Sequence, residues 1–89
     1  MVGLMTWYRL AFQPSILDDL GRLDASLAQR LLNKTKWLAS NAGNLRHEPV
    51  ADDLPGICKY AVEEWRIYYS LDQTEHYVDI HGIVRQKPT

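Results

Sequence analysis

The sequence has one cysteine and no long apolar run, and both features limit the kinds of protein it can be. Its one cysteine, Cys58, excludes an internal disulfide and any zinc site built from several thiolates, and it fits a reducing cytoplasm. No apolar run approaches the roughly 18 residues of a membrane span, and the leading MVGLM is too short and too weakly charged for a signal peptide. We therefore expect a soluble cytoplasmic protein, whose native start is either Met1 or Met5.

An excess of charge of either sign is also missing. The chain has 10 Lys and Arg residues against 11 Asp and Glu residues, which gives a formal net charge of −1. A polyanion such as RNA would therefore have to be bound by a local cluster of cations and not by the field of the whole molecule. The 89 residues, 46% of them hydrophobic, predict one domain, residues 1–89, with a single core. So small a domain is marginally stable alone, which makes a stabilising partner reasonable.

The first half of the chain predicts one strand and two helices. Residues 7–12, WYRLAF, have strand composition with rough alternation, and Pro14 then favours the start of a short helix. Asp24 is a good N-cap for a second helix that runs to about Ser40, and Trp37 falls on its outer side, where a partner or a neighbouring loop would contact it. The predicted core-facing stripe of this helix consists of Leu27, Ala28, Leu31, Leu32, Thr35, Leu38 and Ala39.

The second half predicts three consecutive strands. Residues 41–56 are rich in Pro, Gly, Asn and Asp and are expected to form a loop. Residues 57–85 alternate between polar and apolar side chains and contain two short polar turns. The element order β-α-α-β-β-β predicts an α+β fold, in which two helices pack on one face of a small, mainly antiparallel sheet.

Turn lengths predict how the three strands pair. A two-residue Glu-Glu turn sets Lys59 opposite Tyr68, and a four-residue turn that begins at Asp72 sets Arg66 opposite His81. Directly opposed residues share a face of the sheet. The polar face should then carry Lys59, Arg66, Tyr68, Asp79 and His81. The face under the helices should carry Cys58, Tyr60, Ile67, Tyr69, Leu71, Val78 and Ile80.

The polar face suggests a site for a phosphate. Guanidinium and ammonium groups stabilise the charge that a phosphate gains in its transition state. Histidine is the side-chain type whose unperturbed pKa lies near neutrality, so His81 would act as an acid or a base, while Tyr68 would orient RNA or stack on a base. An ordinary solvated sheet face, with Arg66 paired to Asp79, explains the same pattern equally well. Arg46 lies in the expected loop and is a candidate substrate contact, but surface loops commonly carry charges that have no function.

The order of elements and three segments resemble the RelE/ParE toxin superfamily. The segments are DDLPGICKY, EEWRIYYSLD and IHGIVR. The most diagnostic part is the loop with Leu54 and Gly56, which leads into a basic strand with Lys59 and then into the aromatic-arginine-aliphatic strand of residues 65–69. The resemblance spans nearly the whole chain.

The resemblance implies the toxin of a type II toxin–antitoxin system, neutralised by a cognate antitoxin. Relatives similar to RelE are endoribonucleases that cut messenger RNA in the ribosomal A site, by attack of a ribose 2′-hydroxyl on the adjacent phosphorus, without a metal or another cofactor. Relatives similar to ParE inhibit DNA gyrase instead. Arg66 falls on the strand arginine that stabilises the phosphate, and Lys59 on a lysine of the preceding strand. The expected catalytic residues are Lys59, Arg66, Arg85 and His81, and the expected RNA contacts are Tyr68, Arg46 and Lys87.

Three positions depart from the nuclease pattern. Ile57 stands where a second strand lysine is expected, Arg85 arrives one residue late after Gly82, and the sequence ends at Thr89 before the terminal catalytic tyrosine. Either Arg85 or His81 would have to replace that tyrosine. Three hypotheses follow: a ribosome-dependent nuclease, a gyrase inhibitor without nuclease activity, and a degenerate module that only binds its antitoxin.

Overall fold

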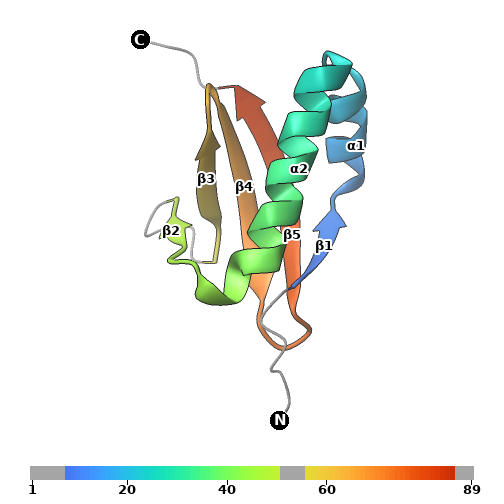
Figure 1. Cartoon of the computed structure of the whole chain (residues 1–89). Coiled ribbons are helices and arrows are strands. Elements are labelled where there is room, and N and C mark those ends of the chain that lie inside the picture. Colours follow the sequence, from blue (N-terminus) through green and yellow to red (C-terminus); the bar gives the residue numbers. More distant parts are fainter. Residues whose placement is uncertain (1–7, 51–55, 86–89) are drawn as a thin grey trace.

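The computed structural model describes residues 8–50 and 56–85, and it has the predicted α+β architecture (Figure 1). One short strand, β2, was not predicted and lies in the segment expected to be a loop. The elements are β1 Arg9–Phe12, α1 Pro14–Gly21, α2 Ala25–Asn41, the 3-10 turn η1 Ala42–Asn44, β2 Glu48–Pro49, β3 Cys58–Val62, β4 Trp65–Asp72 and β5 Tyr77–Arg85.

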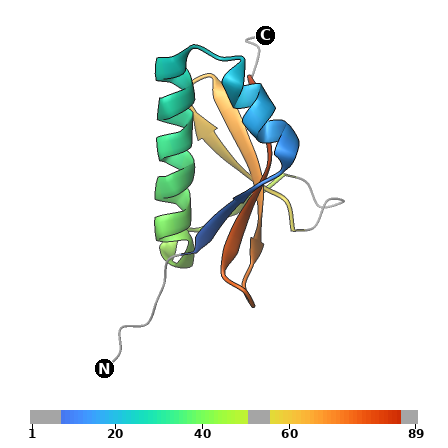
Figure 2. The ribbon, with the colours of Figure 1, turned by 90° about the vertical axis from the view of Figure 1, so that its right-hand side faces the viewer.

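The strands form a five-stranded sheet in the order β1-β5-β4-β3-β2. The pairings are antiparallel except that β1 lies parallel to β5. A chain that leaves β1 and later returns in parallel needs a long connection, and here that connection includes both helices. Figure 2 shows α2 running along one side of the sheet. The described residues contain no helix that would cover the opposite side along β3 and β4.

Both helices begin where the sequence predicts. Pro14 occupies the first turn of α1, where a missing N–H costs nothing, and Ile16 of this helix is buried. Asp24 caps α2, because its carboxylate accepts hydrogen bonds from the backbone N–H groups of Ser26 at 3.1 Å and Leu27 at 3.4 Å. The predicted N-cap is confirmed.

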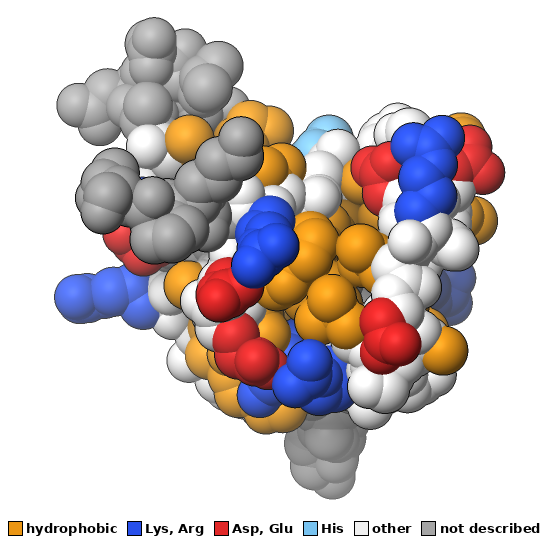
Figure 3. All heavy atoms as spheres, turned by 90° about the horizontal axis from the view of Figure 1, so that it is seen from above, with side chains coloured by type: hydrophobic (Ala, Val, Ile, Leu, Met, Phe, Trp, Pro, Cys, Tyr) orange, Lys and Arg blue, Asp and Glu red, His pale blue; other side chains and the backbone are white. Residues whose placement is uncertain are grey.

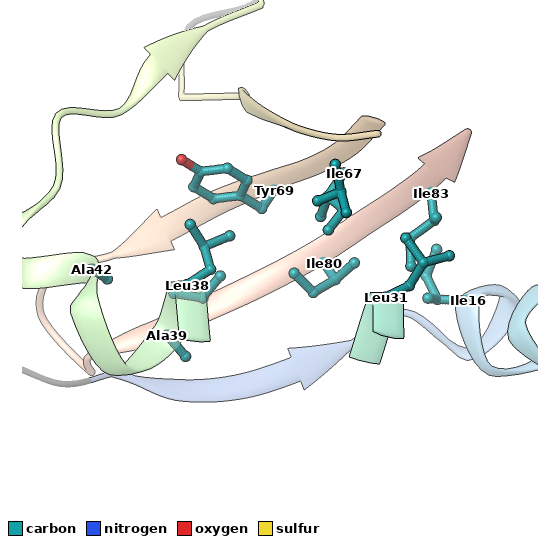
Figure 4. Close-up of a cluster of buried hydrophobic side chains, with 11 residues drawn as sticks. Ile16, Leu31, Leu38, Ala39, Ala42, Ile67, Tyr69, Ile80 and Ile83 are labelled. Carbon is teal, nitrogen blue, oxygen red and sulfur yellow. The ribbon is translucent and has the colours of Figure 1, made fainter. Parts of the chain in front are cut away.

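The core lies between α2 and the sheet (Figure 4). From α2 it contains Leu31, Thr35, Leu38 and Ala39, all buried. The Thr35 hydroxyl donates a hydrogen bond to the carbonyl oxygen of Leu32 at 2.7 Å, which satisfies the one polar group in this stripe. The side chains predicted to face inward are buried or packed against this core, namely Cys58, Tyr60, Ile67, Tyr69, Leu71, Val78 and Ile80.

The predicted pairing of β3 with β4 is confirmed, but the predicted pairing of β4 with β5 is wrong. Lys59 lies opposite Tyr68, as expected. Leu71 lies opposite Val78 and not opposite His76, because the turn ends one residue later than predicted. The turn keeps four residues but also begins one residue later, and Asp72 stabilises it: its carboxylate accepts hydrogen bonds from two backbone N–H groups within the turn, at 3.0 and 2.9 Å.

A β-bulge in β5 changes the register a second time. Tyr69 lies opposite Ile80, but the preceding residue of β4, Tyr68, lies opposite Gly82. His81 is therefore an extra residue with no partner position on β4. Beyond it, every side chain of β5 faces the side opposite to the one an unbroken strand would give.

The bulge has consequences for both faces of the sheet. Ile83 turns inward and joins the core opposite Ile67, with 8% of its surface exposed. Arg66 lies opposite Val84 and not opposite His81, and Arg85 lies opposite the inward-facing Trp65. The end of β5 thus contributes Ile83 to the core and places Arg85 on the face opposite to Arg66.

The cap on α2 gives a first test of the fold. Asp24→Ala should lower the free energy of unfolding by about 1 kcal/mol, because two N–H groups lose their acceptor. Urea unfolding followed by circular dichroism measures this change. Asp18→Ala, an exposed site in α1 with no capping bond, is the matched control and should change stability by less than about 0.5 kcal/mol. Equal losses in the two variants would rule out the cap as a source of stability.

Single-residue deletions test the bulge. Deletion of His81 should lower stability by only about 1 kcal/mol, because the strand then pairs regularly and Ile83 stays in the core. Deletion of Asp79 should cost at least about 2 kcal/mol, because Ile80, which is fully buried, would turn outward. Urea unfolding of both variants makes the comparison. A larger loss for the His81 deletion would refute the assignment of the extra residue.

Candidate functional site

The sheet face opposite α2, called the open face here, contains the predicted cations. Lys59 lies opposite Tyr68, and Arg66 points the same way because it precedes Tyr68 by two residues on β4. As diagonal neighbours in an antiparallel pair, Lys59 and Arg66 are separated by roughly 7–8 Å between backbones. Across the sheet, Arg66 lies opposite Ala61 and Val84, both exposed. The structure thus brings the two predicted cations together on an accessible surface.

Lys59 has an acidic neighbour from β2. Its Nζ lies 3.6 Å from Oε1 of Glu48, and 27% of the lysine side chain is exposed against 69% of the glutamate. So exposed a carboxylate forms a weak, salt-screened ion pair. A phosphate, with more charge and more acceptor oxygens, would compete with Glu48 for the ammonium group.

The Tyr68 ring lies over the backbone of β5. A Cβ atom added at Gly82 would be 3.7 Å from Cδ2 of the ring, which is ordinary van der Waals contact. The glycine opposite Tyr68 therefore leaves a flat surface on which the aromatic ring packs. The half-buried Tyr68 is thus packed on β5, at a position opposite Lys59 and two residues from Arg66 on the same face.

His81 lies on the open face but away from Arg66. Its Nε2 forms a hydrogen bond of 2.8 Å with Oγ of Ser70, and its side chain is exposed. Ser70 is four residues beyond Arg66 on β4, so the two positions are about 13 Å apart along the strand. The predicted opposition of Arg66 and His81 is wrong, because the shifted turn and the bulge together move His81 along the sheet.

Arg85 lies on the other face. Its Nε and Nη2 donate hydrogen bonds to Oε2 of Glu64 at 3.1 and 2.9 Å. It also lines a hollow of about 350 Å³ between α1 and the end of the sheet. The structure therefore does not bring Arg85 together with Arg66.

The hollow has an apolar floor and a charged rim, as Figure 3 shows. Sequence reasoning did not find it, because it depends on the inward turn of Ile83 after the bulge. The ion pairs Asp19–Arg22 and Glu64–Arg85, at 3.8 and 2.9 Å, occupy its rim. Its lining residues are Asp19, Leu20, Arg22, Leu23, Trp65, Ile83, Val84 and Arg85.

His47 links a loop to the core. Its Nε2 lies 2.8 Å from the carbonyl oxygen of Ala42, and its Nδ1 lies 2.7 Å from the hydroxyl of Tyr69. A carbonyl only accepts, so Nε2 carries a proton, and in the neutral ring Nδ1 accepts the phenol proton. Burial raises the pKa of Tyr69, which keeps that phenol protonated as the donor.

The remaining predicted contacts lie apart from the cations or outside the described residues. Arg46 is exposed just before β2, and Lys87 falls outside the described residues. Arg9 was not predicted, yet it is exposed on the open face opposite Tyr77. The alternation in WYRLAF marks Arg9 as pointing outward, but only the parallel pairing of β1 with β5 places it on this face.

Cys58 is unsuited to nucleophilic chemistry. It packs against the core, and burial raises the pKa of its thiol, which disfavours the reactive thiolate. Among the described residues, no three His, Cys, Asp or Glu side chains are grouped so that they could hold a metal ion. Within the same residues, neither helix is long and apolar enough to cross a membrane.

The backbone is similar to solved toxin structures. It matches a chain of the toxin–antitoxin complex RelBE2 from Mycobacterium tuberculosis with a TM-score of 0.80 and 17% identity, over 96% of this chain and 98% of that chain. It matches the isolated E. coli RelE toxin with a TM-score of 0.70 and 16% identity, over 92% and 87% of the two chains. The chain has the RelE fold.

A third similarity is to a chain of the intact E. coli RelBE toxin–antitoxin complex, with a TM-score of 0.63 and 17% identity over 91% of this chain and 99% of that one. No protein-family model and no curated protein matches the sequence. The similarity of the backbones therefore shows the RelE fold, while the sequence identities to these proteins are too low to transfer their function to this chain. Any function has to be argued from the open face.

An alkaline titration tests the contact between His47 and Tyr69. Burial raises the pKa of Tyr69 in the folded state, whereas an unfolded tyrosine has a pKa of about 10. Below about pH 10 both states keep the proton, and above it the unfolded state loses its proton first, so stability falls. The free energy of unfolding of the wild type should fall more steeply above about pH 10 than that of Tyr69→Phe.

Urea unfolding at several alkaline pH values measures the two slopes. Tyr77→Phe, which changes a tyrosine of the open face, is the matched control and should keep the wild-type slope. Parallel slopes for the wild type and Tyr69→Phe would show that this phenol is not protected from ionisation in the folded protein.

Proposed function

We propose that this protein is the toxin of a type II toxin–antitoxin system and that it cleaves messenger RNA on the ribosome. The observation that carries the proposal is the placement of Lys59 and Arg66 together on the open face of a RelE fold. The fold alone is compatible with other activities. The paired cations are what a phosphodiester cleavage needs, because negative charge grows on the phosphate as the reaction proceeds.

The proposed reaction is a metal-free transesterification. The 2′-oxygen loses its proton and forms a bond to the adjacent phosphorus, the bond from phosphorus to the 5′-oxygen breaks, and the 5′-oxygen takes up a proton. The products are a 2′,3′-cyclic phosphate and a 5′-hydroxyl. Arg66 would donate hydrogen bonds to the non-bridging oxygens, and Lys59 would stabilise the same charge once it leaves Glu48.

The other residues of the open face would contact neighbouring parts of the RNA. Tyr68 lies opposite Lys59 and two residues from Arg66 on the same face, and it offers a ring edge and a phenol to a base or a ribose. The His81 ring is hydrogen-bonded to Ser70, which lies four residues, or about 13 Å, from Arg66 along β4, so His81 would contact a neighbouring nucleotide. Stabilisation of charge, more than proton transfer, would therefore be the main contribution of this chain to catalysis.

The proposed partners are a cognate antitoxin and a ribosome with messenger RNA in its A site, in the cytoplasm. Support for the antitoxin comes from the solved structures, since the similar chains include members of toxin–antitoxin complexes and an E. coli RelE variant bound to an antitoxin RelBc peptide. The small core supports it as well, because a bound partner adds stability to a marginal domain.

One observation favours inhibition of DNA gyrase as the second candidate. Arg85 and Arg66 lie on opposite faces, so only two of the expected catalytic cations meet, and one of these has a carboxylate beside it. A protein that acts by binding alone does not need convergent cations. Sequestration by an antitoxin, without either activity, is the third candidate.

Alanine variants test the nuclease. Arg66→Ala should reduce cleavage of ribosome-bound messenger RNA about 100-fold or more, because a comparable loss of a charge donor costs that much in other enzymes. Lys59→Ala should also reduce it, to a smaller extent, because Glu48 already neutralises part of its charge. Primer extension on a transcript in a reconstituted translation system measures the cuts. Arg22→Ala, an exposed arginine of the hollow, is the matched control and should cleave at the wild-type rate.

Two further results would decide among the candidates. Full activity in Arg66→Ala together with loss of activity in Arg85→Ala would move the site to the helix-covered face. Wild-type protein that leaves transcripts intact but blocks supercoiling by gyrase would replace the nuclease with the second candidate, and the absence of both effects would leave the antitoxin-binding module.

A further inference from the structure

Part of β3 forms a sheet edge that no other described strand covers. Among the described residues, β2 pairs only with Cys58 and Lys59, at the start of β3 (Figure 1). The N–H of Val50 donates to the carbonyl of Ile57, so the backbone groups of every second residue from Ile57 onward point toward this edge. Ala61 is one of these, and no described strand lies beside it. An edge of this kind is a template for a strand from another chain.

An aromatic shelf lies next to this edge on the helix side. Trp37 of α2 stacks on Tyr60 of β3, with ring centroids 5.8 Å apart and an angle of 29° between the planes. Trp37 is a large hydrophobic side chain that remains 42% exposed. Tyr60 directly precedes Ala61, so the aromatic shelf formed by Trp37 and Tyr60 borders the open part of β3. Exposed tryptophans in such positions are common anchors of protein interfaces.

The helix beside the shelf is basic. α2 contains three cations and no Asp or Glu residue. Arg30 reaches Glu63 in the turn after β3, with Nη1 3.3 Å from Oε2, which places this side of α2 over the edge. Lys34 lies one helical turn from both Arg30 and Trp37, is exposed, and forms no ion pair with a described residue. The local charge therefore favours an acidic partner.

The hollow near α1 does not indicate the chemistry of a partner as clearly as the edge of β3 does. Its rim charges are paired with one another, so they favour neither sign. The edge of β3 combines three independent features within a few residues: backbone groups that point outward, an apolar anchor and a cation. An RNA strand would use the tryptophan and the lysine, but it would have no use for the backbone groups of Ala61. The three features together fit an extended acidic peptide.

We propose that an extended, acidic segment of a partner protein adds a strand to the sheet beside Ala61. Side chains flanking the residue that pairs with Ala61 would point to the helix side, where an apolar one packs on the aromatic shelf and a carboxylate meets Lys34. The inference rests on the proposed function in one respect, in that the partner is identified as the antitoxin. The docking geometry itself rests on the edge, the shelf and the charge.

The experiment uses the full chain co-expressed with the product of the adjacent gene. Trp37→Ala should weaken the complex about 30-fold or more, which corresponds to the loss of an interface hot spot. Lys34→Glu should weaken the complex at least about tenfold, because the new carboxylate would repel the acidic segment of the partner. Lys36→Glu is the matched control, because Lys36 points about 160° away from Lys34 around the helix, and it should bind within about threefold of wild type.

Hydrogen exchange supplies a measurement that does not depend on these variants. The amide of Ala61 should exchange more slowly in the complex than in the chain alone, because the added strand accepts its hydrogen bond. Urea unfolding of each variant confirms that the fold is intact. Protection at Tyr60–Val62 together with the pattern of Trp37→Ala and Lys34→Glu supports the proposal.

Other outcomes overturn it and remain distinct from failure of the nuclease. If no complex forms, or if a complex forms without protection at Ala61, the strand addition is wrong whatever the chain does to RNA. If Trp37→Ala weakens binding to ribosomes but leaves the protein complex unchanged, the shelf binds RNA and the proposal is wrong. If the complex shows protection at Tyr60–Val62 and weaker binding of both variants, but the wild-type chain cleaves no transcript, the docking site is supported and the proposed nuclease activity is wrong.

Discussion

The extra residue in β5 determines how this small domain divides its side chains between core and surface. Without the bulge at His81, an unbroken strand would direct Ile83 to solvent and Arg85 to the face of Arg66. With it, Ile83 completes the core and Gly82 lies under the ring of Tyr68. One residue therefore keeps Arg85 from acting on the same ligand as Lys59 and Arg66.

The open face depends on topology as much as on register. Because β1 lies parallel to β5, the connection between β1 and the later strands has to cross the sheet, and both helices belong to that crossing. The core forms on the side of α2, and the other side keeps a polar surface across β3 and β4. That surface is not strongly basic, since Glu48 lies against Lys59. Recognition of RNA there would rely on a few positioned groups and on the ribosome for the remainder of the binding.

Local signals in the sequence predicted the parts of the fold that depend on local chemistry. The N-cap at Asp24, the apolar stripe of α2 and the two-residue turn after Val62 follow from residue type and spacing, and so does the meeting of Lys59 with Arg66. The bulge has one local signal, the isolated Gly82 within a strand pattern, but the alternation of residues does not show that His81 is the extra residue. The positions of Arg9 and His47 depend on contacts between distant segments, with β5 and with Tyr69. Their roles could not be derived from neighbours in the sequence.

The edge of β3 and the open face meet at Ala61, so the proposed docking of a partner there would bear on the proposed cleavage. Ala61 lies opposite Arg66 and shares its face. A strand added beside Ala61 would place its paired residue on the same face, about two strand spacings, or roughly 10 Å, from β4. The small Ala61 side chain leaves the intervening space open, so an acidic side chain at that position would reach toward the guanidinium of Arg66. The segment that docks through the aromatic shelf would then also compete with a phosphate for the cation on which the proposed cleavage depends.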